Sequence, residues 1–429
     1  MSSIKLYTGD NREVLKELPD NSVDSVVTDP PYELGFMGKK WDNSGIAYNV
    51  TLWKEVLRVL KPGGYLLSFG GSRTYHRMAV AIEDAGFEIR DQIMWVYGSG
   101  FPKSMNIGKV VDTLQGNERK VVGKGNGKGG ENLNKLSRGN GNDSEDAKSC
   151  GAYGTGAKQI SIEIDITKGT SEYEGWGTAL KPAHEPICMA RKPISEKTVA
   201  ENCLKWGTGG INIDESRVGT TGARNNGNSN GTVGSNSIGV YSKAIKVDYN
   251  MGRFPANFIH DGSDEVVNLF PDGKGAFAPV NSGQKGFGGN IYGKYKQAGD
   301  DGKSYHGDGL GSAARFFYCA KASKSERNEG CEYLDKKNNH PTIKPITLME
   351  YLIKLVTPTN GTVLDPFMGS GTTGIASKQN GFGFVGIEYE PEYVDIARAR
   401  IEYSKPIAEK KNKSKKVNKN IEITPNKFF

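Results

Sequence analysis

Glycine is distributed unevenly along this chain, and the distribution limits how the chain can fold. Of 429 residues, 57 are glycine, and 40 of these lie between residues 98 and 312. They follow no strict triplet, which excludes a collagen-like helix. Residues 1–97 and 313–402 instead have the periodicity of ordinary globular protein. We therefore expect two compact halves separated by long glycine-rich insertions.

Both halves alternate strand patterns with helical ones. The N-terminal half has apolar strand candidates at 23–28 and 65–69, with apolar residues at helical spacing between them. The C-terminal half has a helical pattern at 346–356 and strand candidates at 362–364 and 382–387. This rhythm is typical of an α/β fold with a doubly wound parallel sheet.

The middle of the chain lacks this rhythm. Residues 116–158 and 219–239 are dominated by Gly, Asn, Ser and Lys, and we predict long loops or disordered inserts there. Two apolar segments, 185–191 (EPICMAR) and 314–319 (ARFFYC), are strand candidates between them.

Composition excludes several classes of protein. No apolar run approaches the ~18 residues of a membrane span, and no signal-peptide pattern is present, so we expect a cytoplasmic protein. Five cysteines and five histidines lack paired spacing, so neither a disulfide framework nor a metal site is expected. The net charge is +7, but residues 405–429 hold eight lysines and two acids. Nucleic-acid binding by the remainder must therefore rest on local basic clusters.

A glycine turn follows the strand candidate at 362–364. Residues 365–373 read Asp-Pro-Phe-Met-Gly-Ser-Gly-Thr-Thr, and Glu388 ends the next strand candidate. Glycines let the backbone approach a ligand at the carboxyl end of a sheet, where an acidic residue can accept both hydroxyls of a ribose. The pattern alone is weak, because a tight strand–helix turn also uses glycine.

A second motif, Asp29-Pro30-Pro31-Tyr32, follows the strand candidate at 23–28. Two prolines make the turn rigid, so the Pro30 carbonyl has a fixed direction beside the Asp29 carboxylate. Two adjacent acceptors and the Tyr32 ring suit the exocyclic amine of a planar base. An ordinary Pro-Pro turn would explain the tetrapeptide alone, but not its occurrence together with the glycine turn and Glu388.

Together these motifs resemble those of the amino-group DNA methyltransferases that use S-adenosylmethionine. Further matches are Lys61-Pro-Gly-Gly64, Trp95–Lys103, His340-Pro-Thr-x-Lys-Pro345 and Gly386-Ile-Glu388. The tetrapeptide precedes the glycine turn, which is similar to the motif order of the β group of this family. The resemblance covers most of 1–104, 176–193 and 313–402, and does not account for the glycine-rich inserts.

The resemblance implies a Rossmann-like, circularly permuted sheet of seven strands. Its last two strands, expected at 88–97 and 185–191, would form an antiparallel hairpin interrupted by an insert. The implied domains are a catalytic half (1–98), an insert (99–182), a sheet strand (183–193), a second insert (194–312), a cofactor-binding half (313–402) and a disordered basic tail (403–429). Both inserts would project on the DNA side and supply target recognition.

The resemblance also implies the cofactor and the site. The cofactor is S-adenosyl-L-methionine, and no metal is required. Asp29, Pro30, Pro31 and Tyr32 would form the catalytic site. The implied cofactor-binding residues are Asp10, Asp29, Thr342, Lys344, Asp365, Phe367, Gly369, Ser370, Gly371, Thr372 and Glu388. Asp10 is read equally well as a helix N-cap, and Glu185 is either a family position or a strand-end residue.

Double-stranded DNA is the implied partner. Candidate DNA contacts are Arg73, Arg77, Lys103, Lys321, Lys324 and Arg327, although solvated surface charges explain these residues equally well. The lysine-rich tail would add salt-dependent affinity. No membrane partner is expected. A homodimer and a separately encoded cognate restriction enzyme fit the family, and the sequence leaves open whether the chain acts alone.

The target base is predicted by association within the family. An aspartate at the first tetrapeptide position is more often linked to adenine N6, and a serine to cytosine N4. Cytosine-N4 methylation is the nearest alternative. Methylation of RNA or of protein glutamine is disfavoured by the long insert before the cofactor loop, and a non-catalytic DNA-binding protein is disfavoured by the intact motifs.

Overall fold

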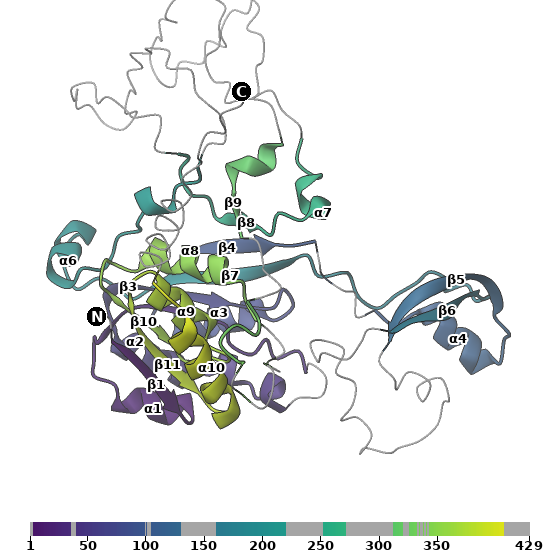
Figure 1. The fold of residues 1–429 in the computed structure, drawn as a ribbon, viewed down its shortest axis with the longest axis horizontal. Helices are drawn as coiled ribbons and strands as arrows, with labels where there is room; N and C mark the ends of the chain where they lie inside the picture. Colours follow the sequence, from purple (N-terminus) through teal and green to yellow (C-terminus); the bar gives the residue numbers. More distant parts are fainter. Residues whose placement is uncertain are drawn as a thin grey trace, which may run out of the picture.

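The computed structural model contains a central α/β body from which one small module extends (Figure 1). The structure describes residues 3–35, 40–98, 100, 104–129, 160–219, 252–271, 312–320, 326–332, 334, 338, 340 and 343–406. Within these ranges no helix is long and apolar enough to cross a membrane.

The body is built on a nine-stranded sheet in the order β1-β11-β10-β2-β3-β7-β4-β8-β9. Its strands are β1 (Ile4–Thr8), β2 (Val23–Thr28), β3 (Leu60–Phe69), β4 (Glu88–Val96), β7 (His184–Arg191), β8 (Phe258–His260), β9 (Tyr318–Cys319), β10 (Thr362–Asp365) and β11 (Gly383–Glu388). Strand β7 is antiparallel to its neighbours β3 and β4, and the other pairs are parallel.

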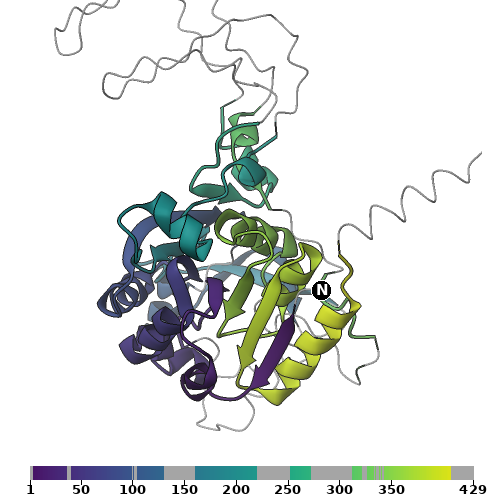
Figure 2. The ribbon, with the colours of Figure 1, turned by 90° about the vertical axis from the view of Figure 1, so that its left-hand side faces the viewer.

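Helices cover both faces of the sheet (Figure 2). One layer holds α1 (Asn11–Glu17), α2 (Val50–Val59) and α3 (Tyr75–Asp84), and the other holds α8 (Ile346–Val356), α9 (Thr372–Gln379) and α10 (Pro391–Tyr403). Consecutive strand residues alternate between the layers: Val26 packs with the α1–α3 layer and Val27 with the α8–α10 layer. Strands buried on both faces explain the continuous apolar runs in the sequence.

Seven of the nine strands have the expected arrangement. Strands β4 and β7 are antiparallel neighbours, so the segment 185–191 lies inside the sheet, as the permuted fold requires. The sheet is wider than the expected seven strands because β8 and β9 pair beyond β4. Strand β8 covers the edge that β4 would otherwise leave open, and β9 pairs with β8 as the last strand of the sheet. The strand expected at 314–319 is shorter, since Ala313–Phe316 is a 3-10 turn before β9.

The module lies between β4 and β7 in the chain. The prediction of loops over 116–158 is wrong for 120–129, which form a strand, and residues 130–158 lie outside the described residues. It contains α4 (Ile107–Gln115) and the antiparallel pair β5 (Lys120–Gly129) and β6 (Ile160–Lys168). Glycine-rich β5 has weak strand propensity, and its strand depends on pairing with the alternating sequence ISIEIDITK of β6. The module is narrow at its base, where the Met105 amide donates to Thr178 Oγ1 at 2.9 Å.

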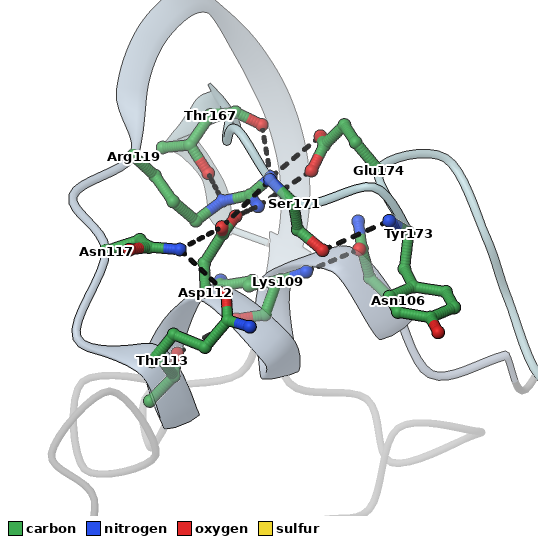
Figure 3. A network of polar contacts seen from close by, with 11 residues as sticks. Asn106, Lys109, Asp112, Thr113, Asn117, Arg119, Thr167, Ser171, Tyr173 and Glu174 are labelled. Atoms are coloured by element: carbon green, nitrogen blue, oxygen red, sulfur yellow. Dashed lines mark hydrogen bonds and ion pairs between the residues drawn. The ribbon is translucent and has the colours of Figure 1, made fainter.

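Ionic contacts hold the module together (Figure 3). Arg119 pairs with Asp112 and, at 2.8 Å, with Glu174, and it also donates to the Thr167 carbonyl at 3.0 Å. Asp112 is fully buried and accepts the Ser171 amide at 3.2 Å. This guanidinium therefore joins α4, β6 and the segment that returns to β7.

Part of the second insert lies at the amino edge of the sheet. Helix α6 (Val199–Trp206) packs at the start of β3, where Asn202 Nδ2 donates to the Pro62 carbonyl at 2.8 Å. Thr208 donates to the same carbonyl at 2.6 Å. The start of β3 is the amino edge of the sheet, so this part of the second insert lies at the edge opposite the motifs, and its place on the DNA side stays a prediction. The predicted loop at 219–239 lies outside the described residues except for its first residue.

Candidate active site

The motifs predicted from sequence meet at one edge of the sheet. Asp29 follows β2, the glycine turn follows β10, and Glu388 ends β11. These strands are parallel, so their carboxyl ends lie together. Strands β2 and β10 are direct neighbours, and Thr28 Oγ1 donates to Asp365 Oδ1 at 2.6 Å. The permuted sheet thus places the two sequence-distant motifs side by side.

Asp365 fixes the shape of the glycine turn. Its carboxylate accepts from Thr28, from Thr373 Oγ1 at 2.6 Å and from the Phe367 amide at 3.1 Å. The side chain is buried, and burial raises its pKa to about 6 against the opposing effect of these hydrogen bonds. Asp365 therefore acts within the protein, tying β2, the turn and α9 together.

The turn needs glycine at two positions. Gly369 and Gly371 have φ of +53° and +83°, a region that disfavours side chains. A Cβ at Gly369 would lie 2.8 Å from His340 Nε2, and one at Gly371 would lie 2.8 Å from Ala397 Cβ. The turn is therefore packed closely against two other segments, and Gly371 ends it at the N-terminus of α9.

Glu388 closes the turn from the neighbouring strand. Its Oε2 accepts the Gly369 amide at 2.8 Å, and its Oε1 accepts the Glu390 amide at 3.0 Å. Burial raises the pKa of Glu388. Each oxygen keeps acceptor capacity beyond these bonds. On the other side of the turn, Asn11 Nδ2 donates to the Pro366 carbonyl at 2.9 Å and so links the start of α1 to it.

Asp29 has two oxygens in different surroundings. Oδ2 accepts from Lys344 Nζ at 2.6 Å. Oδ1 is buried and has no hydrogen-bond partner among the described residues. A buried carboxylate oxygen without a donor is energetically costly. The arrangement therefore leaves one strong acceptor beside the Pro30 carbonyl at the carboxyl edge.

Tyr32 is held by a second carboxylate. Its hydroxyl donates to Glu185 Oε2 at 2.7 Å and accepts from Lys344 Nζ at 3.1 Å. The Tyr97 hydroxyl reaches Glu185 Oε1 at 3.4 Å. The Tyr32 backbone is fixed as well, since Thr74 Oγ1 donates to its carbonyl at 2.7 Å. Burial, with help from Asp29 and Glu185, raises the pKa of Tyr32 well above its usual value, so the phenol stays protonated.

Lys344 joins the two carboxylates. Its Nζ lies 3.3 Å from Glu185 Oε2, in addition to its contacts with Asp29 and Tyr32. The ammonium also lies 4.8 Å from the centre of the Phe69 ring. Burial alone would lower the pKa of Lys344, but Asp29 and Glu185 outweigh it and raise the pKa above its ordinary value. The side chain is thus a buried, permanently charged cross-link.

Other predicted cofactor-binding residues have internal partners. Asp10 is the N-cap of α1 and accepts the Arg12 amide at 2.9 Å. Ser370 is buried and accepts from Arg400, whose Nη1 reaches the Ser370 carbonyl at 2.6 Å. Phe367 packs on Trp53, with ring centres 6.4 Å apart. Thr372 is buried in the first turn of α9.

The predicted DNA contacts are only partly described. Lys103, Lys321 and Lys324, like the predicted cofactor residue Thr342, lie outside the described residues. Arg73 and Arg77 are exposed near the Tyr32 turn. Arg327 instead donates to the His340 carbonyl at 2.7 Å, so its guanidinium shapes the segment that faces Gly369.

Sequence reasoning left Glu185 open and did not single out Thr28 or Arg400. One signal for Glu185 was available. It is the second residue of β7, the antiparallel strand, and the start of an antiparallel strand lies at the carboxyl edge of its parallel neighbours. Thr28 and Arg400 offered no such signal, because their partners come from segments distant in sequence.

Comparison with known proteins identifies the family. The model of the N6/N4 DNA methylase family matches residues 23–399. The type II methyltransferase M2.DpnII of Streptococcus pneumoniae is 51% identical over 63 residues, which are 15% of this chain and 24% of that protein. The type II methyltransferase M2.LlaDCHI of Lactococcus lactis subsp. cremoris is 48% identical over 62 residues, 14% and 23% of the two chains. The matched segment thus spans about a quarter of each relative.

Solved structures give weaker likenesses. The M1.HpyAVI–SAM complex is 17% identical with a TM-score of 0.36, covering 93% of this chain and 100% of that chain. The PvuII DNA methyltransferase (cytosine-N4-specific) is 14% identical with a TM-score of 0.42, covering 93% and 86%. Scores this low add nothing to the assignment, which rests on the family match. Because that match includes Asp29, Asp365 and Glu388 in both halves of the permuted sheet, the chain belongs to the N6/N4 DNA methylase family.

Proposed function

We propose that this protein transfers a methyl group from S-adenosyl-L-methionine to the exocyclic amine of a flipped base in double-stranded DNA, with adenine N6 as the target. The observation that carries this proposal is the buried Oδ1 of Asp29, which has no hydrogen-bond partner among the described residues. It lies next to a rigid Pro-Pro turn and a fixed tyrosine ring. An exocyclic amine carries two N–H donors, one for Asp29 Oδ1 and one for the Pro30 carbonyl.

The residues around the glycine turn fit a nucleoside cofactor. Gly369 and Gly371 give the turn between β10 and α9 its left-handed backbone conformation, and Glu388 keeps acceptor capacity at the end of β11 for ribose hydroxyls. When bound, S-adenosyl-L-methionine supplies an electrophilic methyl group on a sulfonium. Asp365 would act by holding the turn, since its oxygens already accept three internal hydrogen bonds.

The chain's own groups address the weak nucleophilicity of a base amine. Its lone pair is delocalised into the ring. Asp29 Oδ1 and the Pro30 carbonyl would accept the two amine hydrogens and localise that lone pair toward the methyl donor. Positioning supplies much of the rate, and the negative carboxylate stabilises the positive charge that develops on the nitrogen.

The target base must leave the duplex to reach this site. Flipping costs a few kcal/mol. Tyr32 would recover part of this by stacking on the base, worth about 1–3 kcal/mol. Its ring is held in advance through its hydroxyl and its carbonyl, so little side-chain entropy is lost when the base arrives.

Adenine N6 is favoured over cytosine N4 only by the aspartate in the tetrapeptide. Cytosine N4 stays the second candidate, since cytosine presents the same amine beside a ring acceptor.

The inserts are proposed to read the target sequence. The position of the α4–β5–β6 module supports this proposal, because the module leaves the sheet at the carboxyl end of β4 and returns at the start of β7 (Figure 1).

A substrate panel tests the proposal. The protein is incubated with methyl-labelled S-adenosyl-L-methionine and with duplex DNA, RNA or protein. We expect label in DNA only, and a loss of about 100-fold or more in rate for Asp29→Ala with cofactor affinity kept. Asp24→Asn is the matched control, because Asp24 pairs with Lys61 at 2.6 Å at the other end of β2. Asp24→Asn should keep its rate per folded molecule. An Asp29→Ala rate equal to wild type contradicts the mechanism.

A further inference from the structure

Glu185 enters the site from a strand that runs against its neighbours. It pairs with Trp95 of β4 near the start of β7, which brings its carboxylate to the edge where Asp29 and Tyr32 lie. No hydrogen bond among the described residues joins Glu185 to the glycine turn or to Glu388. Its contacts are instead with Tyr32, Tyr97 and Lys344.

These contacts involve the Lys344 ammonium, which is the hydrogen-bond donor next to Asp29. A lysine ammonium has three N–H groups, and Lys344 has three partners: Asp29 Oδ2, Tyr32 Oη and Glu185 Oε2. With the ammonium directed at these three partners, Asp29 Oδ1 has no donor among the described residues. Without Glu185, a side chain that is only 8% exposed would need another partner for its ammonium, and Asp29 Oδ1 is an acceptor without a partner in the described part of the chain.

Glu185 also sets the net charge of the array formed by Asp29, Lys344 and Glu185. Asp29 and Lys344 alone form a neutral pair. With Glu185, which is 18% exposed, the two carboxylates and one ammonium carry a net charge of −1. A negative, water-poor array stabilises positive charge that develops on a bound amine.

We propose that Glu185 is a positioning residue for methyl transfer: it draws the Lys344 ammonium and the Tyr32 hydroxyl into one array, so that Asp29 Oδ1 stays open to the target amine. The inference rests on the proposed function and deepens it. Glu185 itself need not touch the base. It acts through Lys344, which orients Asp29, and through Tyr32, which stacks on the base.

The test is a kinetic comparison of Glu185→Gln with wild type on duplex DNA. Glutamine keeps the size of the side chain but removes its charge and one acceptor. We expect kcat to fall about tenfold or more, with the KM for S-adenosyl-L-methionine unchanged. Glu185→Asp, which keeps the charge, should lie between the two. Glu88→Gln is the matched control, because Glu88 lies at the far end of the same strand pair and contacts Arg191 at 2.6 Å.

A double-mutant cycle with Tyr32→Phe separates positioning from general damage to the fold. Phenylalanine keeps the stacking ring and removes the hydroxyl that Glu185 holds. If the two residues act together, Glu185→Gln should cost about threefold less in kcat in the Tyr32→Phe background than alone. Additive effects, or a Glu185→Gln enzyme with wild-type kcat, overturn the inference. If wild type transfers no methyl to DNA, the proposed function itself fails, which is a distinguishable result.

Discussion

Asp29 follows β2 and Asp365 ends the neighbouring strand β10, but their carboxylates have opposite surroundings. Asp365 accepts hydrogen bonds from two threonines and an amide. Asp29 accepts from one lysine, and its other oxygen is buried with no partner in the part of the chain that the structure describes. A satisfied carboxylate stabilises the fold, and an unsatisfied one stores free energy that a substrate can release. At the residue scale, this contrast separates the structural aspartate from the proposed catalytic one.

The pKa of Asp365 makes a stability prediction. Burial raises it from 3.8 to about 6, so between these values the folded protein holds a proton that the unfolded chain has lost. The free energy of unfolding, relative to Asp365→Asn, should therefore fall as pH rises from about 4 to about 6 and stay level above that. The total fall is on the order of 3 kcal/mol. Urea unfolding of both proteins across this range measures it, and a difference independent of pH contradicts it.

At the element scale, the glycine turn between β10 and α9 combines two constraints. Gly371 has φ of +83°, and a Cβ there would also meet Ala397 at 2.8 Å. Gly381 has nearly the same φ, +80°, but nothing within 4 Å of its Cβ position. Alanine substitutions at Gly371 and Gly381 therefore separate the cost of backbone strain from the cost of steric crowding.

Gly381→Ala should cost only the backbone term, about 1–2 kcal/mol. Gly371→Ala should cost more and should also weaken S-adenosyl-L-methionine binding, because the turn must move away from α10. Urea unfolding and titration calorimetry of the two variants provide the measurements. Equal stability loss in both, with unchanged cofactor binding, would show that the turn tolerates the movement.

Elements with strong patterns were predictable from sequence. The strand at 23–28 and the helix at 346–356 coincide with β2 and α8, because apolar runs and helical spacing dominate there. Strand β5 was missed because its order depends on pairing with β6. The positions of the tetrapeptide and the glycine turn were also predictable. The Glu185–Lys344–Asp29 array was not, since its members come from three segments that only the folded sheet brings together.

At the scale of the whole molecule, one catalytic body carries a module on a narrow neck. The two chain segments that join the module to the body meet at Ser104, whose Oγ accepts the Thr178 amide at 2.9 Å. The sheet next to them is continuous, because β4 and β7 are paired. This arrangement allows the sequence of the module to change without disturbing the active site. It fits the proposal that the insert reads DNA sequence while the body transfers the methyl group.

Removal of the module tests this division. Joining Ser104 to Thr178 through a short Gly/Ser linker should preserve the sheet and the affinity for S-adenosyl-L-methionine, because no described contact of the cofactor turn involves the removed residues. Methylation at the protein's own DNA motif should be lost. Single-molecule sequencing of DNA from cells expressing each protein reads the motif. The same methylated motif from both would exclude the module as the reader.

Nucleoside mass spectrometry measures most directly whether the protein methylates DNA and which base it modifies. Duplex DNA is treated with the protein and S-adenosyl-L-methionine, digested and compared with DNA treated with Asp29→Ala. We expect N6-methyladenine with wild type and none with the variant. Detection of N4-methylcytosine instead would support the same active site and would identify cytosine as the target base. DNA without any methylated nucleoside after treatment with the wild-type protein would contradict the account.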